Sequence, residues 1–285
     1  MSFFNQSQTK KIISFALTAG EIATKFFLEK NFEIKKKSDG SEVTSADIAV
    51  SEFLREKLAQ EFPQIPVICE EGNLREASDI FFLIDPIDGT SSFISNNVEF
   101  AINIALIKNK KAIFGLIYAP LFEGGKMIFS DEKGEVLSKK NNVMLSLSKH
   151  DSEQFFESCF DKLNMTSMMF NAMSKPLRII TSSRTKDIDV EKYLAQFHPE
   201  FSQNFSVEKL ASAIKFFRIL EGDADLYLHF RRSMEWDSAA GQALIELLGG
   251  KVKNLFFNQK KFSIGDELSY GKPNFENTPF VVTIV

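Results

Sequence analysis

At residues 83–93, LIDPIDGTSSF, an apolar run that is typical of a buried strand ends on two acids. Pro86 holds φ at about −65° and stiffens the turn, so that Asp85 and Asp88 can point at one place. Clustered carboxylates repel one another unless a cation lies between them, and an oxygen-only cluster suits a hard ion such as Mg²⁺. The simpler alternative is a strand ending at Asp85 and then an Asp-Gly turn, and this stretch alone favours neither.

The segment after the second acid, GTSSF, favours the start of a helix. Free N–H groups at a helix start can bind an anion, and Gly89 lets the backbone approach that anion closely because glycine has no Cβ. We therefore expect a metal site and a phosphate site to adjoin.

Four other acidic residues indicate a site only when they are considered together. Glu70 and Glu71 follow the apolar stretch IPVIC and, taken alone, are typical of a solvated strand end. Asp47 falls in the first turn of an expected helix, and Asp237 in EWDSAAG is, taken alone, typical of a helix cap.

Hydrophobic periodicity predicts the elements of the first half. We expect a helix over residues 9–30, a second helix with Thr44 as N-cap, strands at IPVIC and IFFLID, and a hairpin FAINIALI–KNKK–AIFGLIYA. The basic stretch EIKKKSDGSE is predicted to be a loop, and its KKK at 35–37 to be a solvated face.

In the second half, the predicted elements are strand LRIITSS, helix VEKLASAIKFFRIL ended by Gly222, strand ADLYLHF and helix EWDSAAGQALIELLGG ended by Gly249. Residues 141–175 show neither helical nor alternating periodicity and are interpreted as a connector or insertion. This segment would separate an N-terminal α+β subdomain at 1–140 from a C-terminal α/β subdomain at 176–285.

Composition limits the partners and the surroundings of the protein. A net charge of −4 and a pI near 5.6 argue against a nucleic-acid polymer as partner, since that needs a basic surface. No stretch reaches about 18 uninterrupted apolar residues, so no integral membrane association is expected. Cys69 and Cys159 are too few for a disulfide framework and favour the cytoplasm, while His150, His198 and His229 lack metal-ligand spacing. A peripheral membrane contact and a homodimer stay open.

Taken together, DPIDGT, the upstream EE and the downstream WDSAAG resemble the inositol monophosphatase superfamily of Mg²⁺-dependent, lithium-sensitive phosphatases, over most of the chain. Within it, EFAINIALI, GLIYAP and IKFFRILEGDADLY are similar to the CysQ branch, the 3′(2′),5′-bisphosphate nucleotidases. The resemblance implies an α/β (α+β) fold, a layered αβαβα sandwich of the sugar-phosphatase type. It also implies hydrolysis of the 3′-phosphate of 3′-phosphoadenosine 5′-phosphate by two-metal, in-line attack of water.

The same resemblance implies a metal site with two or three Mg²⁺ ions. One ion would be held by Glu70, Asp85 and the backbone carbonyl of Ile87. A second would be held by Asp85, Asp88 and Asp237, so that Asp85 bridges the two. Asp237 is also expected to contact the substrate. Two such ions can stabilise the attacking and the leaving oxygens of a phosphoryl displacement.

Catalytic and substrate-binding roles are implied in the same way. Thr90, assisted by Asp47, would orient and activate the attacking water. The N–H groups of Gly89, Thr90 and Ser91 would bind the phosphate, and Lys215 would lie near the substrate. The expected partner is therefore a small phosphorylated molecule.

The chain departs from the CysQ pattern where substrate contacts are expected. Ser91-Ser92 stands where CysQ proteins usually have Lys-Glu, and SSRTKD stands where relatives commonly have Ser-Arg-Ser-His. Arg231 and Arg232 could supply charge for a second phosphate, or could be ordinary solvated cations.

Two alternatives to a bisphosphate nucleotidase follow from these departures. The same machinery could hydrolyse inositol monophosphate or another small sugar phosphate. A metal-binding or nucleotide-binding protein without turnover is the other alternative, and the intact acids and Thr90 argue against it.

Overall fold

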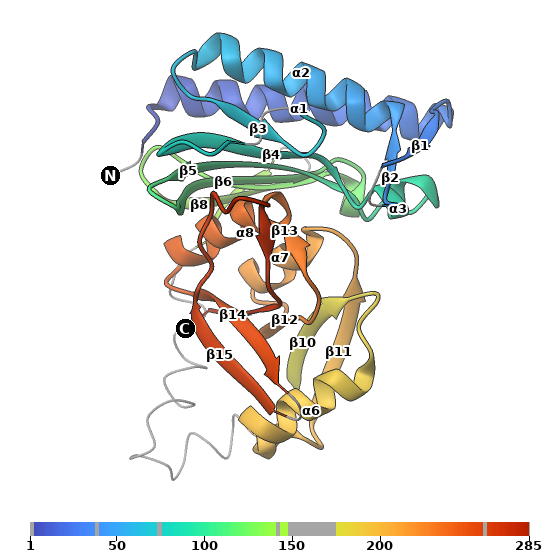
Figure 1. The fold of residues 1–285 in the computed structure, drawn as a ribbon, viewed down its shortest axis with the longest axis vertical. Helices are drawn as coiled ribbons and strands as arrows, with labels where there is room; N and C mark the ends of the chain where they lie inside the picture. The colour runs from blue at the N-terminus through green and yellow to red at the C-terminus, as the bar shows by residue number, and fades with distance from the viewer. Residues whose placement is uncertain are drawn as a thin grey trace.

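The chain folds into stacked layers, which Figure 1 shows from the N-terminal helices at the top to α6 at the bottom. The computed structural model describes residues 3–37, 40–72, 76–140, 143–147, 175–258 and 261–284. The layers are α1 (Gln6–Glu29) with α2 (Ser45–Glu61), a seven-stranded sheet, α7 (Ile214–Leu220) with α8 (Glu235–Leu247), a six-stranded sheet, and α6 (Asp187–Phe197). This order of layers confirms the predicted αβαβα sandwich.

Helices α1 and α2 cover the outer face of the first sheet with the apolar stripes that their sequences predict. Ile12 of α1 and Val50 of α2 are fully buried in one cluster with strand residues such as Phe82. Thr44 caps α2 by accepting hydrogen bonds from the N–H groups of Ala46 and Asp47. The predicted helix start is therefore confirmed, with Asp47 in the first turn.

The first sheet has the strand order β3-β4-β5-β6-β7-β8-β9. β3 and β4 run parallel, and β5 and β6 form the predicted hairpin. α3 (Thr90–Ile94) follows β4 and confirms the expected helix start at GTSSF. The strands are Val67–Cys69 (β3), Ile80–Asp88 (β4), Ala101–Lys108 (β5), Lys111–Ala119 (β6), Lys126–Ser130 (β7), Val136–Lys140 (β8) and Val143–Leu147 (β9), with the 3-10 helix η1 at Phe122–Gly124.

The prediction of a loop at EIKKKSDGSE is wrong in part. Residues Ile34–Lys36 (β1) and Glu42–Thr44 (β2) pair as an antiparallel hairpin. All of β1 is exposed, so its backbone hydrogen bonds form the strand without any alternation of buried and exposed side chains. Hydrophobic periodicity carries no signal for such a strand.

The second sheet has the strand order β11-β10-β12-β17-β14-β15. Its inner face packs on α7 and α8, and its outer face packs on α6. The strands are Leu177–Ser182 (β10), Phe205–Leu210 (β11), Leu226–His229 (β12), Lys251–Asn258 (β14), Lys261–Glu267 (β15) and Phe280–Thr283 (β17), beside the short pair Ser233–Met234 (β13) and Glu276–Asn277 (β16) and the 3-10 helix η3 at Pro199–Phe201.

The predicted helix VEKLASAIKFFRIL is wrong in its first part. VEKL belongs to strand β11, which pairs in parallel with β10. Ser212 has a φ of +59°, a conformation that breaks a right-handed helix, and α7 begins only at Ile214. The second part of the prediction is confirmed, because IKFFRIL forms α7.

The predicted connector at 141–175 lies mostly outside the described residues. Its residues Val143–Leu147 form β9, an edge strand paired with β8. For the rest, and for the two-subdomain division, the prediction stays a prediction. In the part of the chain that the structure describes, no helix has both the length and the apolar character needed to cross a membrane.

Candidate active site

Strand β4 brings its two acids to one side of the sheet by means of a β-bulge. Asp85 pairs with Asn103 and Asp88 pairs with Ala101, so β4 has one residue more than β5 in this interval. Residues three apart on a regular strand point to opposite faces, and the extra residue reverses that alternation. Asp85 also accepts a hydrogen bond of 3.1 Å from the N–H of Ile87, which holds the bend.

Asp88 is held by groups from both halves of the chain. The N–H of Ala213, just before α7, donates to Asp88 Oδ2, and Asn103 Nδ2 donates to the same oxygen at 3.4 Å. Asn103 also donates to the carbonyl of Trp236 in α8 at 3.3 Å. The first sheet and both central helices therefore meet at this carboxylate.

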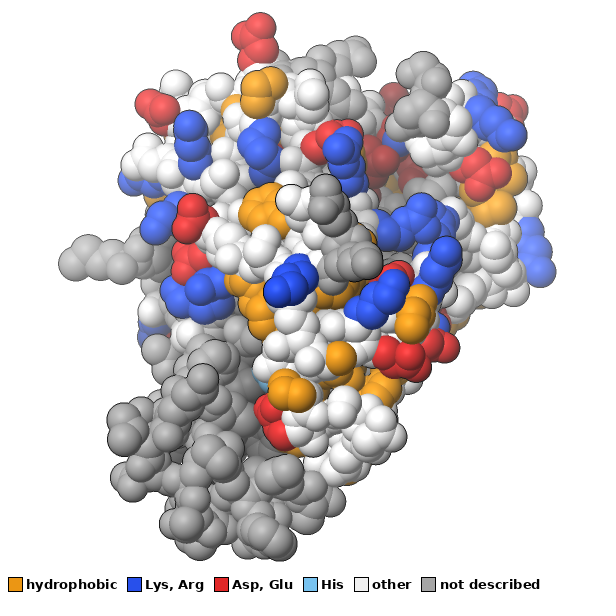
Figure 2. Space-filling model, turned by 60° about the horizontal axis from the view of Figure 1, so that its bottom comes forward, with side chains coloured by type: hydrophobic (Ala, Val, Ile, Leu, Met, Phe, Trp, Pro, Cys, Tyr) orange, Lys and Arg blue, Asp and Glu red, His pale blue; other side chains and the backbone are white. Residues whose placement is uncertain are grey.

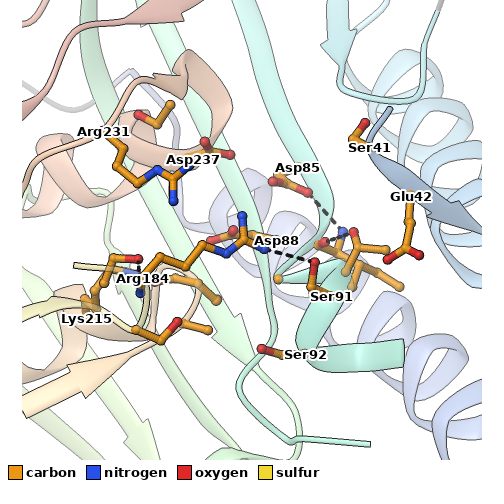
Figure 3. Close-up of a pocket in the computed structure, with 18 of the residues that line it drawn as sticks. Ser41, Glu42, Asp85, Asp88, Ser91, Ser92, Arg184, Lys215, Arg231 and Asp237 are labelled. Atoms are coloured by element: carbon orange, nitrogen blue, oxygen red, sulfur yellow. Dashed lines mark hydrogen bonds between the residues drawn. The ribbon is translucent and has the colours of Figure 1, made fainter. Parts of the chain in front are cut away.

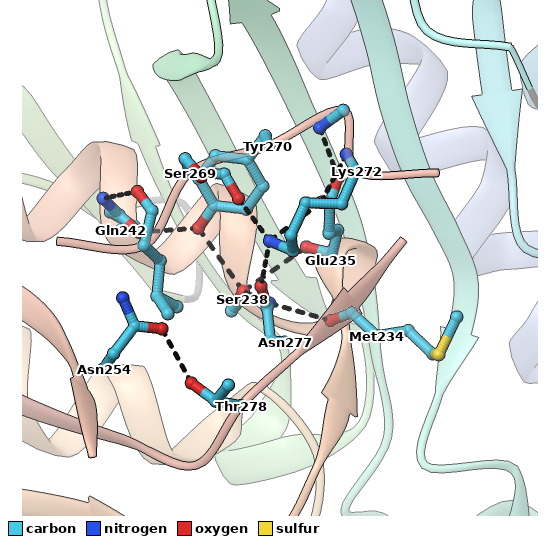
Figure 4. Close-up of polar contacts among 12 residues, drawn as sticks. Met234, Glu235, Ser238, Gln242, Asn254, Ser269, Tyr270, Lys272, Asn277 and Thr278 are labelled. Carbon is cyan, nitrogen blue, oxygen red and sulfur yellow. Dashed lines mark hydrogen bonds and ion pairs between the residues drawn. The ribbon is translucent and has the colours of Figure 1, made fainter. Parts of the chain in front are cut away.

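The first turn of α8 aims Asp237 at the same place. Asp237 Oδ2 accepts a hydrogen bond of 2.8 Å from the N–H of Met234. The neighbouring Glu235 is fully buried and accepts from the N–H groups of Gly271 and Lys272 at 2.7 and 3.0 Å (Figure 4). Lys272 Nζ completes this cluster with an ion pair to Glu235 at 2.9 Å.

Further polar contacts in Figure 4 extend the support along α8. Asn277 Nδ2 donates to Ser238 Oγ at 2.7 Å, and the hydroxyl of Tyr270 donates to Gln242 Oε1 at 2.7 Å. These buried side chains join the first two turns of α8 to strand β16 and to the loop between β15 and β16. The backbone that carries Asp237 is therefore fixed on two sides.

Three carboxylates converge as a result. One oxygen from each of Asp85, Asp88 and Asp237 lies within 4.8 Å of the others (Figure 3). Burial raises the pKa of each carboxyl group, and repulsion from Glu70 raises all three further. Oxygen donors alone, buried and mutually repelling, fit a hard divalent cation.

Glu70 lines the same cavity but stands outside that group of three. Its Oε1 lies 2.7 Å from Lys37 Nζ, which also contacts Glu71 Oε1 at 2.5 Å. Burial alone would lower the pKa of Lys37, but the charges of Glu70 and Glu71 outweigh burial and raise it. The prediction of a solvated face at 35–37 is therefore wrong for Lys37.

The two expected catalytic residues are in contact although they are 43 positions apart. Thr90 Oγ1 lies 3.0 Å from Asp47 Oδ1 and 3.1 Å from the carbonyl oxygen of Ile87. Asp47 is 1% exposed, and its second oxygen accepts from the N–H of Thr44 at 2.8 Å. Burial raises the pKa of Asp47, while the hydrogen bonds from Thr44 and Thr90 oppose the rise.

The turn before α3 needs glycine. Gly89 has a φ of +97°, and a Cβ there would lie 2.7 Å from the carbonyl oxygen of Glu99. Gly89, Thr90 and Ser91 all line the cavity, and Arg184 Nη2 donates to Ser91 Oγ at 3.3 Å (Figure 3). The segment SSRTKD therefore reaches the DGT segment directly.

The cavity holds about 760 Å³ and carries cations at its rim. Figure 2 shows Lys and Arg side chains gathered round a hollow with acidic side chains deeper inside. Lys215 is buried, and burial lowers its pKa to about 8 against the opposing charges of Asp88 and Asp237. Arg231 and Arg232 also line the cavity.

Sequence reasoning missed three polar residues of this cavity. Ser212 Oγ, His229 Nε2 and Ser233 Oγ are buried and have no hydrogen-bond partner within the described residues. His229 Nδ1 lies 3.2 Å from the hydroxyl of Tyr227, and burial lowers the pKa of His229 to about 3, so the ring is neutral. His229 falls within the strand pattern ADLYLHF, and only its unpaired atom in the folded chain marks it.

Three converging carboxylates, the glycine turn and the hydroxyl of Thr90 thus line one cavity, with Asp47 buried behind Thr90. Phosphoryl transfer asks a protein mainly for positioning and for charge, and this cavity supplies both. The fold and the site define the class of protein, a phosphatase.

The chain belongs to the inositol monophosphatase family, since a sequence model of that family matches residues 5–274. It is 30% identical over 253 residues to the 3′(2′),5′-bisphosphate nucleotidase CysQ of Salmonella typhimurium, covering 87% of this chain and 90% of the relative. For CysQ of Buchnera aphidicola, the identity is 28% over 272 residues, covering 93% and 91%. The crystal structure of CysQ from Bacteroides thetaiotaomicron superimposes with a TM-score of 0.70 at 26% identity, over 99% of both chains.

Proposed function

We propose that this phosphatase uses Mg²⁺ to hydrolyse the 3′-phosphate of 3′-phosphoadenosine 5′-phosphate. The observation that carries the proposal is the convergence of Asp85, Asp88 and Asp237 within 4.8 Å, beside the contact between Asp47 and Thr90. The names of the two CysQ relatives, both 3′(2′),5′-bisphosphate nucleotidases, support the choice of substrate.

The metal centre would use the oxygen donors of one cavity. Glu70, Asp85 and the carbonyl of Ile87 would hold one ion, and Asp85, Asp88 and Asp237 would hold a second. When bound, the ions supply positive charge to the attacking and the leaving oxygens of the phosphoryl group. The mutual repulsion that raises the pKa of these acids would then be relieved.

Thr90 and Asp47 would act on the attacking water. Asp47 Oδ1 accepts the hydroxyl proton of Thr90, which leaves a lone pair on Thr90 Oγ1 free to accept a proton from water. As the water oxygen bonds to phosphorus, its proton passes to Thr90 and the proton of Thr90 passes to Asp47. The bond from phosphorus to the 3′-oxygen breaks, and that oxygen takes up a proton from solvent.

The DGT turn would hold the phosphate that reacts. Backbone N–H groups of Gly89, Thr90 and Ser91 are the expected donors, and the left-handed φ of Gly89 forms the turn that presents them. Arg184 is tied to Ser91 and adds a guanidinium group next to the phosphate position.

The remaining part of the cavity favours a bisphosphate over a monophosphate. One phosphate beside the metal needs no further cation, yet Lys215, Arg231 and Arg232 line the same space. The unpaired His229 Nε2 and Ser233 Oγ add hydrogen-bonding groups that the sugar and the second phosphate can use. Inositol monophosphate, the alternative substrate, would leave these groups unsatisfied.

A phosphate-release assay with Mg²⁺ tests the proposal on three substrates: 3′-phosphoadenosine 5′-phosphate, inositol 1-phosphate and fructose 1,6-bisphosphate. We expect the highest kcat/KM on the adenosine bisphosphate, with release of one phosphate and loss of activity after chelation. A higher kcat/KM on inositol 1-phosphate would overturn the substrate assignment. Full activity with a chelator present would overturn the metal-dependent mechanism.

A further inference from the structure

The ammonium group of Lys37 contacts the carboxylates of two adjacent residues, Glu70 and Glu71. Its Nζ lies 2.7 Å from Glu70 Oε1 and 2.5 Å from Glu71 Oε1. The turn after β1 fixes its backbone, because the N–H of Lys37 donates to the carbonyl of Ser41 at 2.8 Å and its own carbonyl accepts from Gly40 at 3.0 Å. The contact is therefore part of the hairpin and is not a chance approach of a long side chain.

The side chains involved are largely withdrawn from solvent. Lys37 and Glu70 are 22% and 24% exposed, and Glu71 is 8% exposed. An ion pair at this depth is screened less than a surface pair. Glu70 also adds to the electrostatic repulsion on Asp85, Asp88 and Asp237, so Lys37 neutralises the outer end of the whole acid cluster.

Lys37 and a divalent cation cannot both lie against Glu70 without repelling each other. The carboxylate that Glu70 would offer to a metal ion already binds the lysine through Oε1. Glu71 gives the displaced ammonium a second partner, which already lies 2.5 Å from Lys37 Nζ. The lysine can thus give up Glu70 and keep a buried counter-charge.

We propose that Lys37 is a built-in competing cation, which neutralises Glu70 in the metal-free protein and passes to Glu71 when a divalent cation binds. The proposal rests on the metal centre proposed above and adds a positioning residue that sets its metal affinity. The competing explanation is that Lys37 only attaches the β1–β2 hairpin to the end of β3.

Mn²⁺ binding, measured by electron paramagnetic resonance on the full chain, separates the two explanations. We expect Lys37→Met to bind Mn²⁺ about fivefold or more tightly than wild type, within the range usual for coupled sites. Lys35→Met removes an equal charge from the same hairpin, at an exposed residue that does not line the cavity, and should change the affinity less than twofold. Unchanged or weaker binding by Lys37→Met would overturn the proposal.

Lys37→Arg provides a second variant that keeps the charge and the hairpin contact. A guanidinium group can bridge both carboxylates at once, so this variant should bind Mn²⁺ more weakly than wild type. Glu71→Gln should also weaken Mn²⁺ binding, and this effect should largely vanish in the Lys37→Met background. Equal effects of Glu71→Gln in both backgrounds would contradict an exchange at Lys37.

The Mn²⁺ titrations of wild type and variants also distinguish failure of the Lys37 exchange from failure of the metal centre. Saturable Mn²⁺ binding that does not respond to Lys37 refutes the exchange and leaves the metal centre standing. Absence of saturable binding in every variant, in protein that folds normally, refutes the metal centre and the exchange together.

Discussion

The two carboxylate oxygens of Asp47 have different partners, one in the cap of α2 and one in the proposed proton relay. Oδ2 accepts from Thr44 and closes the cap of α2, while Oδ1 accepts from the hydroxyl of Thr90. Loss of the cap and loss of the proton relay should therefore appear in different measurements.

Asp47→Asn should lower kcat by about 10²–10⁴-fold, as expected for a lost general base or its relay. The free energy of unfolding should fall by about 1–3 kcal/mol, because Asp47 is buried and accepts hydrogen bonds from Thr44 and Thr90. Mg²⁺ affinity should survive, because the clustered acids are intact. Glu52→Gln, an exposed acid on the same helix, is the matched control. Near-normal kcat in Asp47→Asn would make Asp47 a helix-start residue only.

His229→Leu tests recognition of the part of the substrate that does not react. A typical hydrogen bond contributes about 0.5–1.5 kcal/mol, so KM for 3′-phosphoadenosine 5′-phosphate should rise about three- to tenfold with little change in kcat. His198→Leu removes a histidine that does not line the cavity and should leave KM unchanged. An equal rise of KM in both variants would argue against a contact at His229.

At the scale of elements, the buried ion pair of Glu235 and Lys272 supports the start of α8, which carries the proposed metal ligand Asp237. Glu235 holds the backbone of Gly271 and Lys272 and directly precedes the residues that carry Asp237 into the cavity. The support is thus independent of the metal ligands themselves.

Glu235→Gln should lower the free energy of unfolding by about 1–3 kcal/mol, because it weakens hydrogen bonds at a fully buried site. Mg²⁺ affinity should fall as well, since Asp237 loses its fixed position. Thermal unfolding and Mg²⁺ titration check both effects. Glu246→Gln lies on α8 away from its start and should spare the affinity; a loss of affinity in both variants would contradict this role for Glu235.

At the scale of the whole molecule, the acid cluster makes stability depend on pH and on metal together. Asp85, Asp88 and Asp237 have pKa values above the ordinary 3.8, with burial as the largest cause. The folded, metal-free protein therefore holds protons more tightly than the unfolded chain, and this contribution to stability is lost as pH rises through the raised pKa values.

Mg²⁺ bound by these acids, as proposed, would replace those protons, so its stabilising effect should grow with pH. The rise in Tm on adding Mg²⁺ should be larger at pH 8 than at pH 5.5. Differential scanning calorimetry at the two pH values measures it. An equal shift at both, or a larger one at pH 5.5, would contradict this linkage.

Sequence patterns predicted the elements whose packing follows one period, such as α1, α2, the β5–β6 hairpin and α8. They missed β11, where half-buried and exposed residues alternate only from Phe205 to Glu208 before the exposed Lys209 breaks the pattern. The two acids of β4 were predicted from their spacing, but the bulge that turns them to one side depends on pairing with β5. The contact of Lys37 with Glu70 likewise exists only in the folded chain.

The central claim is that Asp85, Asp88 and Asp237 bind the metal on which turnover depends. The most direct test is an anomalous difference map from crystals soaked in Mn²⁺, collected on protein whose Mn²⁺-dependent phosphate release has been measured. We expect a peak bounded by these three carboxylates, with activity lost in Asp85→Asn. An active protein with no Mn²⁺ peak at these carboxylates would contradict it.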